Sequence, residues 1–290
     1  MDFFRLTKSK WLAVMAIGML CLVSCDKIKK PYRVEEKLIA CDTPSFPTLN
    51  NVLQKYLLED YTGHTCTNCP RAHKIAHDLI VQMGDTLVVM AIHAGDNARP
   101  EEETGNCSFT ADYRTEAGNS YVREFTITAY PNGMINRMRI NGNRTVMYSN
   151  WKKTLDTISR KAPLMAIQIM TEDNNENTCI FVKTSLLSPI SGKLRLCVFV
   201  TENGIISPQK DAATTKCDYE HNHVLRASIA PIWGDDLDMT AKDESLIKGY
   251  SVDFKDKVWK KENCHIIAFI YRNDGSMEIL QVEEIKLVEK

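Results

Sequence analysis

The chain has 290 residues, with 36 basic and 37 acidic side chains, and 44% of its residues are hydrophobic. This balance of charge argues against a nucleic-acid partner, because binding to phosphates needs an excess of clustered lysine and arginine. The length suffices for one large domain or two medium-sized domains with adequate cores.

The first 24 residues are predicted to be a secretory signal peptide. Arg5, Lys8 and Lys10 form a basic start, and residues 11–24 are uncharged and largely apolar. Fourteen residues are too few to cross a bilayer as a helix, but they suit the apolar part of a signal peptide. Removal of this segment leaves 33 basic and 36 acidic side chains, which gives no basic surface either.

The leader ends in Leu22-Val23-Ser24-Cys25, which resembles a bacterial lipobox. In that resemblance Cys25 is acylated and becomes the new N-terminus, whereas an ordinary signal followed by an incidental cysteine is the alternative. Acyl chains contribute about 0.8 kcal/mol per buried methylene, so two or three of them anchor a soluble domain. We therefore predict the membrane as a partner through the lipid on Cys25, and a tether over residues 25–48.

The pair Cys66 and Cys69 is the most informative motif of the chain. It follows an apolar, β-type run at residues 56–61 and precedes a helical pattern at residues 72–80, with Pro70 suited to a first helical turn. A helix that begins at Cys66 would place this sulfur near free N–H groups and the positive end of the helix dipole. Both favour the thiolate, so Cys66 is expected to be the more acidic and more exposed cysteine, and Cys69 to form or resolve the disulfide. Strand, CxxC and helix in this order are the signature of thioredoxin.

The chain continues with a mixture of strands and helices up to residue 162. Residues 85–93 form a short, β-branched run that is typical of a buried parallel strand. The polar stretch that follows is predicted to be an insertion with a helix at 112–124. Later elements are a strand at 134–140 and an amphipathic helix at 151–159.

Tyr130 and Pro131 come immediately before the strand at 134–140, and Asn132-Gly133 marks a turn. In thioredoxin-like folds a cis-proline lies at the equivalent place and faces the CxxC motif. A cis bond before proline costs only about 0.5–1 kcal/mol. We therefore expect a cis bond between Tyr130 and Pro131, in a loop that docks the substrate backbone.

After Ala162-Pro163 the pattern changes to short β-rich runs separated by turns. The last two runs are joined at Asn273-Asp274-Gly275, a strong hairpin signal. About seven strands without helical periodicity indicate an Ig-like β-sandwich. We thus predict an α/β thioredoxin-like domain over 49–162, followed by an all-β sandwich over 163–290. The expected strands are 165–170, 178–186, 194–201, 223–230, 250–254, 265–271 and 277–282.

Six further cysteines remain after the signal peptide, Cys25 and the CxxC pair are set aside. An exported protein can form structural disulfides, but six cysteines allow 15 pairings, between which the sequence does not choose. Cys179, Cys197 and Cys264 lie in strand-like runs and are candidates for buried free thiols. The others are Cys41, Cys107 and Cys217.

Residues 52–160 resemble the thioredoxin superfamily. In that family a buried acid occupies the position of Asp60 and accepts the proton of the resolving cysteine, here Cys69. Thr65 stands where the family usually has a tryptophan.

More closely, the mature chain resembles the twenty-eight-kilodalton outer-membrane lipoprotein family of Gram-negative bacteria. The resemblance implies a thioredoxin-like domain joined to a β-sandwich, anchored at the outer membrane and facing the periplasm or the surface. The segments that carry it are 59–64, 68–70, 92–95, 130–134 and 222–226.

The CxxC motif leaves three chemical interpretations open. A redox-active dithiol is the first, and a permanent structural disulfide is the second. The third is a zinc or copper site, since Cys66, Cys69, His73 and His77 are four potential ligands within twelve residues and the two histidines share a helix face. The four ligands would span about 16 Å of helix, so one ion cannot bind them all. We therefore predict no cofactor. His64 precedes the cysteines and is predicted to influence the pKa of Cys66. His93 is predicted to end a strand as a structural, hydrogen-bonded residue.

Two functions follow. The first is thiol–disulfide exchange in the cell envelope, in which Cys66 attacks, Cys69 resolves, Asp60 relays a proton and Tyr130-Pro131 presents the substrate. Its partners would be envelope proteins with cysteines. The second is a binding or adhesion lipoprotein, in which the thioredoxin-like half is a scaffold and the β-sandwich makes the contacts.

Overall fold

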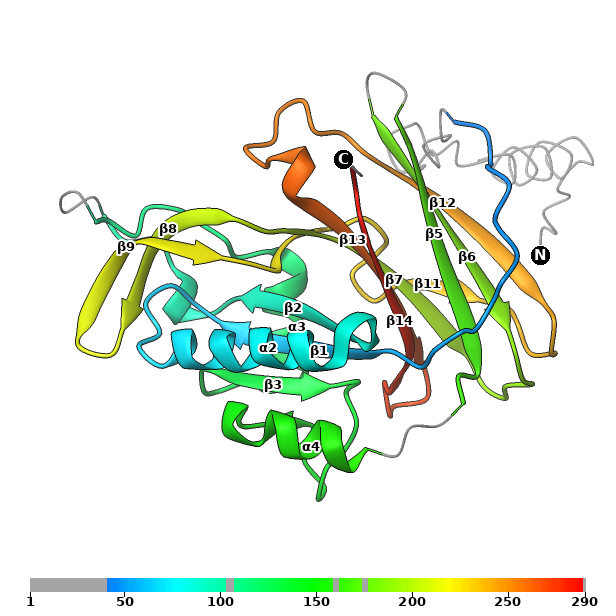
Figure 1. Ribbon diagram of the computed structural model, residues 1–290, viewed down its shortest axis with the longest axis horizontal. Helices are drawn as coiled ribbons and strands as arrows, with labels where there is room; N and C mark the ends of the chain where they lie inside the picture. The colour runs from blue at the N-terminus through cyan, green and yellow to red at the C-terminus, as the bar shows by residue number, and fades with distance from the viewer. Residues whose placement is uncertain (1–40, 103–106, 159–161, 174–176, 289–290) are drawn as a thin grey trace, which may run out of the picture. The chain divides into compact units, whose positions relative to one another are not determined.

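The computed structural model describes residues 41–102, 107–158, 162–173 and 177–288. The predicted signal peptide, Cys25 and most of the predicted tether lie outside the described residues. The fold is mostly β, and its helices lie in the N-terminal part (Figure 1). None of the described helices combines the length and the apolar character that a membrane crossing requires.

The N-terminal part is built on two parallel strands, β1 (Tyr56–Thr62) and β2 (Leu87–His93), which pair along their whole length. Every residue of both strands is buried, as expected where helices or other layers cover both faces of a sheet. β3 (Asn132–Ile135) runs antiparallel to β1, and β4 (Thr145–Val146) pairs with β3. The strands predicted at 56–61 and 85–93 are thereby confirmed.

β3 is shorter than the strand predicted at 134–140. It ends at Ile135 because the next two residues, Asn136 and Arg137, adopt left-handed backbone conformations with φ of 47° and 53°. This bend turns the Arg137 guanidinium into the core, where it forms a 2.7 Å ion pair with the buried Glu59 of β1.

The helices are α2 (Cys69–Met83), α3 (Glu116–Glu124) and α4 (Trp151–Thr157). The prediction that a helix begins at Cys66 is wrong. The chain makes a turn there, in which the Cys69 N–H bonds to the Cys66 carbonyl at 3.3 Å, and Pro70 then occupies the first helical turn. Short 3₁₀ turns are η1 (Gly84–Thr86), η2 (Asp96–Ala98), η3 (Tyr148–Asn150) and η4 (Lys261–Asn263).

α3 is shorter than the helix predicted at 112–124, because the Thr115 side chain accepts a hydrogen bond from the Gly118 N–H and caps the helix at that point. α4 buries Trp151 and Leu155 as predicted, against the same core as β1 and α2.

The C-terminal part consists of antiparallel strands. β12, β6 and β5 form one sheet, which packs on β7, β13 and β14 across a hydrophobic core that includes Val182, Val198 and Ile266. The described strands are ten rather than about seven. They are β5 (Met165–Asp173), β6 (Thr178–Leu186), β7 (Leu194–Glu202), β8 (Ile205–Asp211), β9 (Thr214–His221), β10 (Val224–Ser228), β11 (Asp235–Leu237), β12 (Ser245–Val252), β13 (Cys264–Arg272) and β14 (Ile279–Lys286).

One mixed sheet runs through both parts of the described chain, in the order β14-β13-β7-β10-β2-β1-β3-β4 with β11 beside β7 (Figure 1). The link is β10, which pairs antiparallel with β7 and meets β2 where the Ala91 N–H donates to the His223 carbonyl at 2.8 Å. The hydrophobic core on this sheet combines Ile92 with Phe199 and Phe269. The division into two domains near residue 162 stays a prediction.

Disulfides join distant segments. Cys41, the first described residue, pairs with Cys179 of β6. The segment before β1 is therefore attached to the C-terminal part, and the Gln168 side chain also donates a hydrogen bond to the Pro47 carbonyl in this segment. The expectation that Cys179 is a free thiol is therefore wrong. Cys197 and Cys264 are free and buried, as expected.

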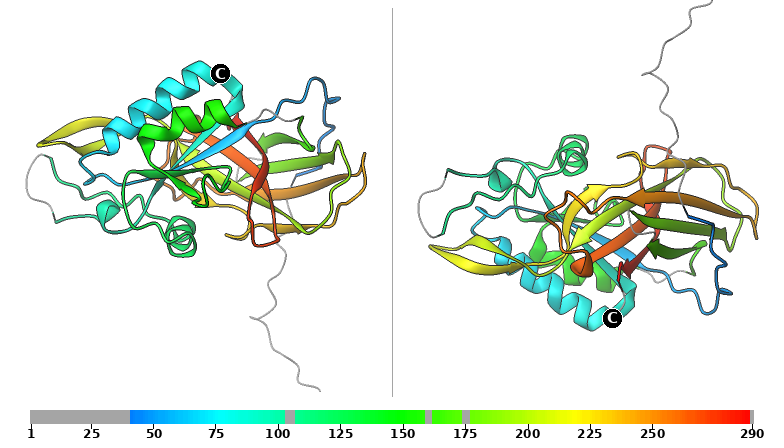
Figure 2. Two further views of the ribbon diagram at one scale, coloured as in Figure 1. Left: turned by 90° about the horizontal axis from the view of Figure 1, so that it is seen from below. Right: turned by 90° about the horizontal axis from the view of Figure 1, so that it is seen from above.

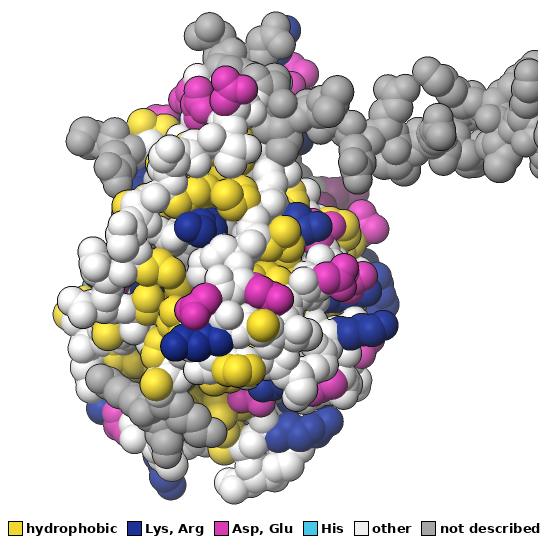
Figure 3. Space-filling model, turned by 90° about the vertical axis from the view of Figure 1, so that its right-hand side faces the viewer, with side chains coloured by type: hydrophobic (Ala, Val, Ile, Leu, Met, Phe, Trp, Pro, Cys, Tyr) yellow, Lys and Arg dark blue, Asp and Glu magenta, His cyan; other side chains and the backbone are white. Residues whose placement is uncertain are grey.

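The surface carries both signs of charge. On the face that Figure 3 shows, lysine and arginine alternate with aspartate, glutamate and apolar side chains, and no basic stripe crosses it. This agrees with a net charge close to zero.

Candidate thiol–disulfide site

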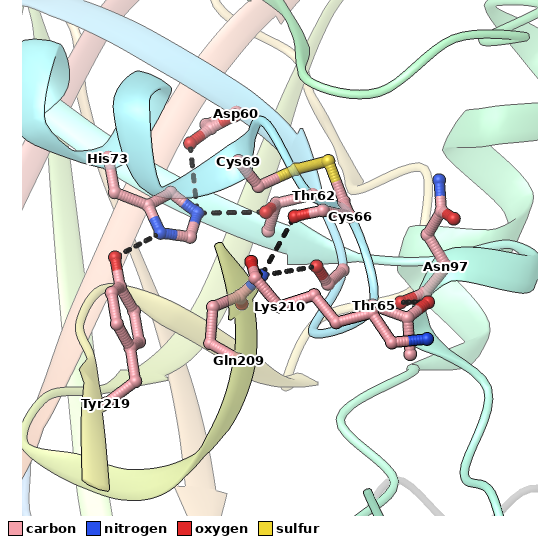
Figure 4. Close-up of a disulfide and its surroundings, with 11 residues drawn as sticks. Asp60, Thr62, Thr65, Cys66, Cys69, His73, Asn97, Gln209, Lys210 and Tyr219 are labelled. Carbon is pink, nitrogen blue, oxygen red and sulfur yellow. Dashed lines mark hydrogen bonds and ion pairs between the residues drawn. A yellow bond between two sulfur atoms is a disulfide. The ribbon is translucent and has the colours of Figure 1, made fainter. Parts of the chain in front are cut away.

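Cys66 and Cys69 form a disulfide, with 5.4 Å between their Cα atoms. Cys66 lies in the loop between β1 and α2, and Cys69 is the first residue of α2 (Figure 4). Cys66 is the more exposed of the two, as predicted, but only 5% of it reaches solvent, and Cys69 is fully buried. Such a pair can accept two electrons and two protons, and access to Cys66 controls the reaction.

Asp60 lies in the middle of β1 and is 1% exposed. Its Oδ1 has no hydrogen-bond partner among the described residues. Burial raises the pKa of this carboxyl to about 8. The group is therefore mainly protonated at neutral pH, and it can give up or take a proton close to that pH.

His73 connects Asp60 with the surroundings of the disulfide. Its Nε2 lies 3.8 Å from Oδ2 of Asp60 and 2.9 Å from Oγ1 of Thr62, and its Nδ1 lies 2.8 Å from the Tyr219 hydroxyl (Figure 4). Burial lowers the pKa of His73 to about 3, so the ring is neutral. Because His73 follows Cys69 by four residues on α2, the two side chains share one helix face.

The hairpin of β8 and β9 packs against the loop that carries Cys66. The fully buried Gln209 side chain donates to the Gly63 carbonyl at 3.3 Å and to the Cys66 carbonyl at 3.0 Å. Backbone N–H groups of Lys210 and Ala212 donate to the carbonyls of His64 and Thr67. The loop is thus held on this side by main-chain and side-chain hydrogen bonds from β8.

The sequence interpretation missed this hairpin. β9 is largely exposed, so it has no alternation of apolar residues that would mark it. Its only local signal is a run of strand-favouring residues, Thr214, Thr215 and Tyr219, between polar neighbours.

The segment after β2 holds the same loop from another direction. The Asn97 carbonyl accepts from the Thr65 N–H at 3.0 Å and from its hydroxyl at 3.1 Å. Gly63 is packed so closely on Asn97 that a Cβ would lie 2.3 Å from its carbonyl oxygen. Thr65 therefore holds the loop through two hydrogen bonds to Asn97.

His64 belongs to this loop, and its side chain is buried. Its ring packs near Phe109 and Tyr113, and its Nε2 is 3.0 Å from the Arg99 carbonyl. Burial lowers the pKa of His64, so the neutral ring offers no positive charge to a thiolate. An effect of His64 on the pKa of Cys66 stays a prediction.

His93 ends β2, as predicted, but the expectation that it is hydrogen-bonded is wrong. Neither ring nitrogen has a partner among the described residues. The ring packs against Tyr113 and His221 instead, at centroid distances of 5.4 and 5.6 Å. Burial lowers the pKa of His93 well below its ordinary value.

The bond between Tyr130 and Pro131 is cis, as predicted. Pro131 is buried, and Tyr130 packs against Gly95, where a Cβ would lie 2.8 Å from the tyrosine hydroxyl. Docking of a substrate at this loop stays a prediction.

A cleft of about 480 Å³ reaches Asp60 between α2 and the hairpin, and its lining includes His73, Tyr219 and His223. The histidine proposed as a fourth metal ligand, His77, lines the same cleft but is exposed. In the part of the chain that the structure describes, no group of three or more His, Cys, Asp and Glu side chains is arranged to hold a metal ion. A larger cleft of about 1000 Å³ lies elsewhere, lined by α4 and β14 among others.

Solved structures share this fold. HBP35 of Porphyromonas gingivalis is 16% identical over 82% of this chain and 77% of its own, with a TM-score of 0.63. A protein of Agrobacterium tumefaciens is 13% identical over 83% of this chain and 98% of its own, with a TM-score of 0.53. No functionally curated protein matches the sequence significantly.

The family comparison is more specific. A domain of the outer membrane lipoprotein Omp28 from Porphyromonas gingivalis is 20% identical over 45% of this chain and 93% of its own, with a TM-score of 0.31. The family model of outer membrane protein Omp28 matches residues 118–290, which is more than half of the chain. On this match of the family model alone, the chain belongs to the Omp28 family of outer membrane proteins.

Proposed function

We propose that this outer membrane protein is a thiol–disulfide oxidoreductase whose reacting group is the Cys66–Cys69 disulfide. The observation that carries the proposal is Asp60, a buried carboxyl with a pKa of about 8. It lies 3.8 Å from His73, which shares a helix face with Cys69. Buried acids with pKa values near the working pH are typical of sites that move protons.

The reaction starts from the oxidised form. A thiolate of a substrate dithiol attacks Sγ of Cys66, the sulfur–sulfur bond to Cys69 breaks, and Cys69 takes a proton from the protonated Asp60. The second substrate thiolate then attacks the substrate sulfur of the mixed disulfide and releases Cys66 as a thiolate, which is protonated from water. The substrate becomes a disulfide, the protein becomes a dithiol, and two electrons are transferred.

The proposed setting is a lipid-anchored protein with a thioredoxin-like part and an Ig-like β-sandwich. Support for the first part comes from the parallel pair β1 and β2, from α2 directly after the cysteines, and from the cis-proline before β3. Support for the second part comes from two antiparallel layers that share one core. Acylation of Cys25 rests on the lipobox-like sequence.

The test of the proposal is the rate at which a dithiol reduces the Cys66–Cys69 disulfide. This rate is measured by alkylating the free cysteines at successive times and identifying them by peptide mass spectrometry. Asp60→Asn should slow this step by about 100-fold at pH 7, because the leaving Cys69 loses its proton donor. The ratio of the rate of the unmodified protein to the rate of Asp60→Asn should fall as the pH rises through about 8, where Asp60 itself ionises. Asp78→Asn, which changes an exposed carboxyl on α2, is the control. Equal rates for Asp60→Asn and the control would show that Asp60 has no part in the chemistry.

The scaffold function is the second candidate, and the burial of the cysteines favours it. Only 5% of Cys66 and none of Cys69 is exposed. If the disulfide resists a dithiol in the folded protein, the CxxC pair stabilises the loop and the β-sandwich is the part that binds.

A further inference from the structure

The hairpin that packs on the Cys66 loop is attached to the rest of the molecule by a disulfide of its own. Cys217 of β9 pairs with Cys107, which lies in the segment before α3, 110 residues earlier in the sequence. The proposed function does not use this bond. Its two sulfurs join two pieces of chain that approach the CxxC loop from different sides.

The other attachments of the hairpin are noncovalent. Among the described residues, β8 and β9 pair only with each other, and Figures 1 and 2 show the pair projecting beyond the large sheet. An isolated pair of strands is marginally stable in water. Besides the disulfide, its position depends on the hydrogen bonds of Gln209, Lys210 and Ala212 to the CxxC loop. It also depends on Tyr219 at His73 and on the packing of the buried His221 against His93 and Tyr113.

The segment that follows Cys107 also contacts β8. Phe109, two residues after Cys107, packs on the His64 ring and lies under the Lys210 ammonium group, 5.5 Å from the ring centre. The Cys107 segment, the hairpin and the residue before Thr65 therefore form one packed unit. A change in the position of the hairpin affects the loop of Cys66 directly.

The disulfides differ in their access to solvent. Cys217 is exposed and Cys107 is half-buried, whereas Cys66 is 95% buried and Cys69 completely so. Thiol–disulfide exchange requires a thiolate to approach one sulfur directly, so access decides which bond reacts. An external dithiol reaches Cys217 before it reaches Cys66.

We propose that Cys107–Cys217 is a second redox site, which takes electrons from an external dithiol and whose reduction opens the Cys66–Cys69 disulfide to exchange. The claim that reduction opens Cys66–Cys69 to exchange rests on the proposed function, whereas the claim that Cys107–Cys217 takes electrons from a dithiol does not. A thiolate of the dithiol attacks Sγ of Cys217, and Cys107 leaves as a thiolate that is protonated from water. The second thiol of the dithiol, as its thiolate, then displaces Cys217. The dithiol becomes a disulfide, and both cysteines become thiols.

The structural consequence is the loss of the covalent attachment of β9. The hairpin is then held by hydrogen bonds and packing alone, so it separates more often from the CxxC loop. When it does, the Cys66 carbonyl loses its bond from Gln209 and the loop gains freedom to present Cys66. The two disulfides therefore react in a fixed order.

The test follows every disulfide of the full mature protein during reduction by dithiothreitol, with acid quenching, alkylation and peptide mass spectrometry. In the unmodified chain, Cys107–Cys217 should be reduced first, and Cys66–Cys69 should follow after a lag. In the double variant Cys107→Ser, Cys217→Ser, the lag should vanish and Cys66–Cys69 should be reduced about tenfold faster or more. The matched control is Cys41→Ser, Cys179→Ser, which removes a disulfide away from the hairpin and should preserve the lag.

A second variant tests the proposal without removing a disulfide, so its result does not depend on whether the double variant folds. Gln209→Ala keeps every cysteine and removes the side-chain bonds to the loop, together with one to the neighbouring Lys210 carbonyl. It should shorten the lag without changing the rate at which Cys107–Cys217 is reduced. Reduction of Cys66–Cys69 before or together with Cys107–Cys217 would overturn the proposal, and so would an unchanged rate in the double variant. These results do not depend on Asp60, so they are distinguishable from a failure of the Asp60→Asn experiment.

Discussion

Asp60→Asn should change how the free energy of unfolding depends on pH. In the folded protein the pKa of Asp60 is about 8, because burial disfavours the charged carboxylate. In the unfolded chain its pKa is close to the ordinary value of about 3.9. The folded state therefore holds this proton more tightly than the unfolded state, and the folded state is favoured most at low pH.

The size of the effect follows from this difference. The contribution is fully present below about pH 3.9 and is lost as the pH rises to about 8. At 1.36 kcal/mol for each pH unit, the loss is about 4 kcal/mol between pH 4 and pH 7. Asparagine does not ionise, so the variant should lack this loss and should gain about 4 kcal/mol relative to the unmodified protein over that interval.

Urea unfolding at pH 4, 5.5, 7 and 8.5 measures the difference between the two proteins. Buried histidines such as His73 and His221, whose pKa values burial lowers to about 3 and 4, titrate in both proteins and largely cancel in this comparison. Asp78→Asn, on the exposed face of α2, should follow the unmodified curve. A difference between Asp60→Asn and the unmodified protein that stays constant from pH 4 to pH 8.5 would refute the reasoning.

Three further predictions concern other features of the molecule. Arg137→Met should lower the free energy of unfolding by about 3–5 kcal/mol in a urea titration, since it leaves the buried Glu59 carboxylate without its ion-pair partner, and a loss below 1 kcal/mol would contradict this. Gly63→Ala should destabilise the protein by about 1–3 kcal/mol or more, because its Cβ would collide with the Asn97 carbonyl; a variant with the unfolding midpoint of the parent protein would show that the loop yields. Mass spectrometry of the mature protein should find an acylated N-terminal Cys25, and an unmodified Cys25 or a different first residue would disprove the lipid anchor.

The buried elements of this fold were predictable from the sequence because burial leaves a pattern. β2 is apolar up to its last residue, and β1 and β6 are mainly apolar or β-branched; all three lie within a residue or two of their predicted bounds. The CxxC motif could be identified because it lies between a buried strand and an amphipathic helix, whereas the role of Asp60, inside β1, was expected only from the resemblance to the thioredoxin superfamily.

The features that the sequence did not reveal depend on contacts between distant residues. The pairing of Cys107 with Cys217 and of Cys41 with Cys179 is decided by the tertiary structure, as is the parallel meeting of β10 with β2. β9 could not be recognised because its side chains face solvent. The start of α2 was misplaced because a turn at Cys66 and the cap at Asn68 precede the helix.

The reduction potential of the Cys66–Cys69 disulfide tests the central claim most directly. It is measured by equilibrating the mature protein in dithiothreitol buffers of known potential and quantifying both cysteines after alkylation. A redox-active site predicts a potential well above about −300 mV, and a value below it would identify the bond as structural and contradict the oxidoreductase function.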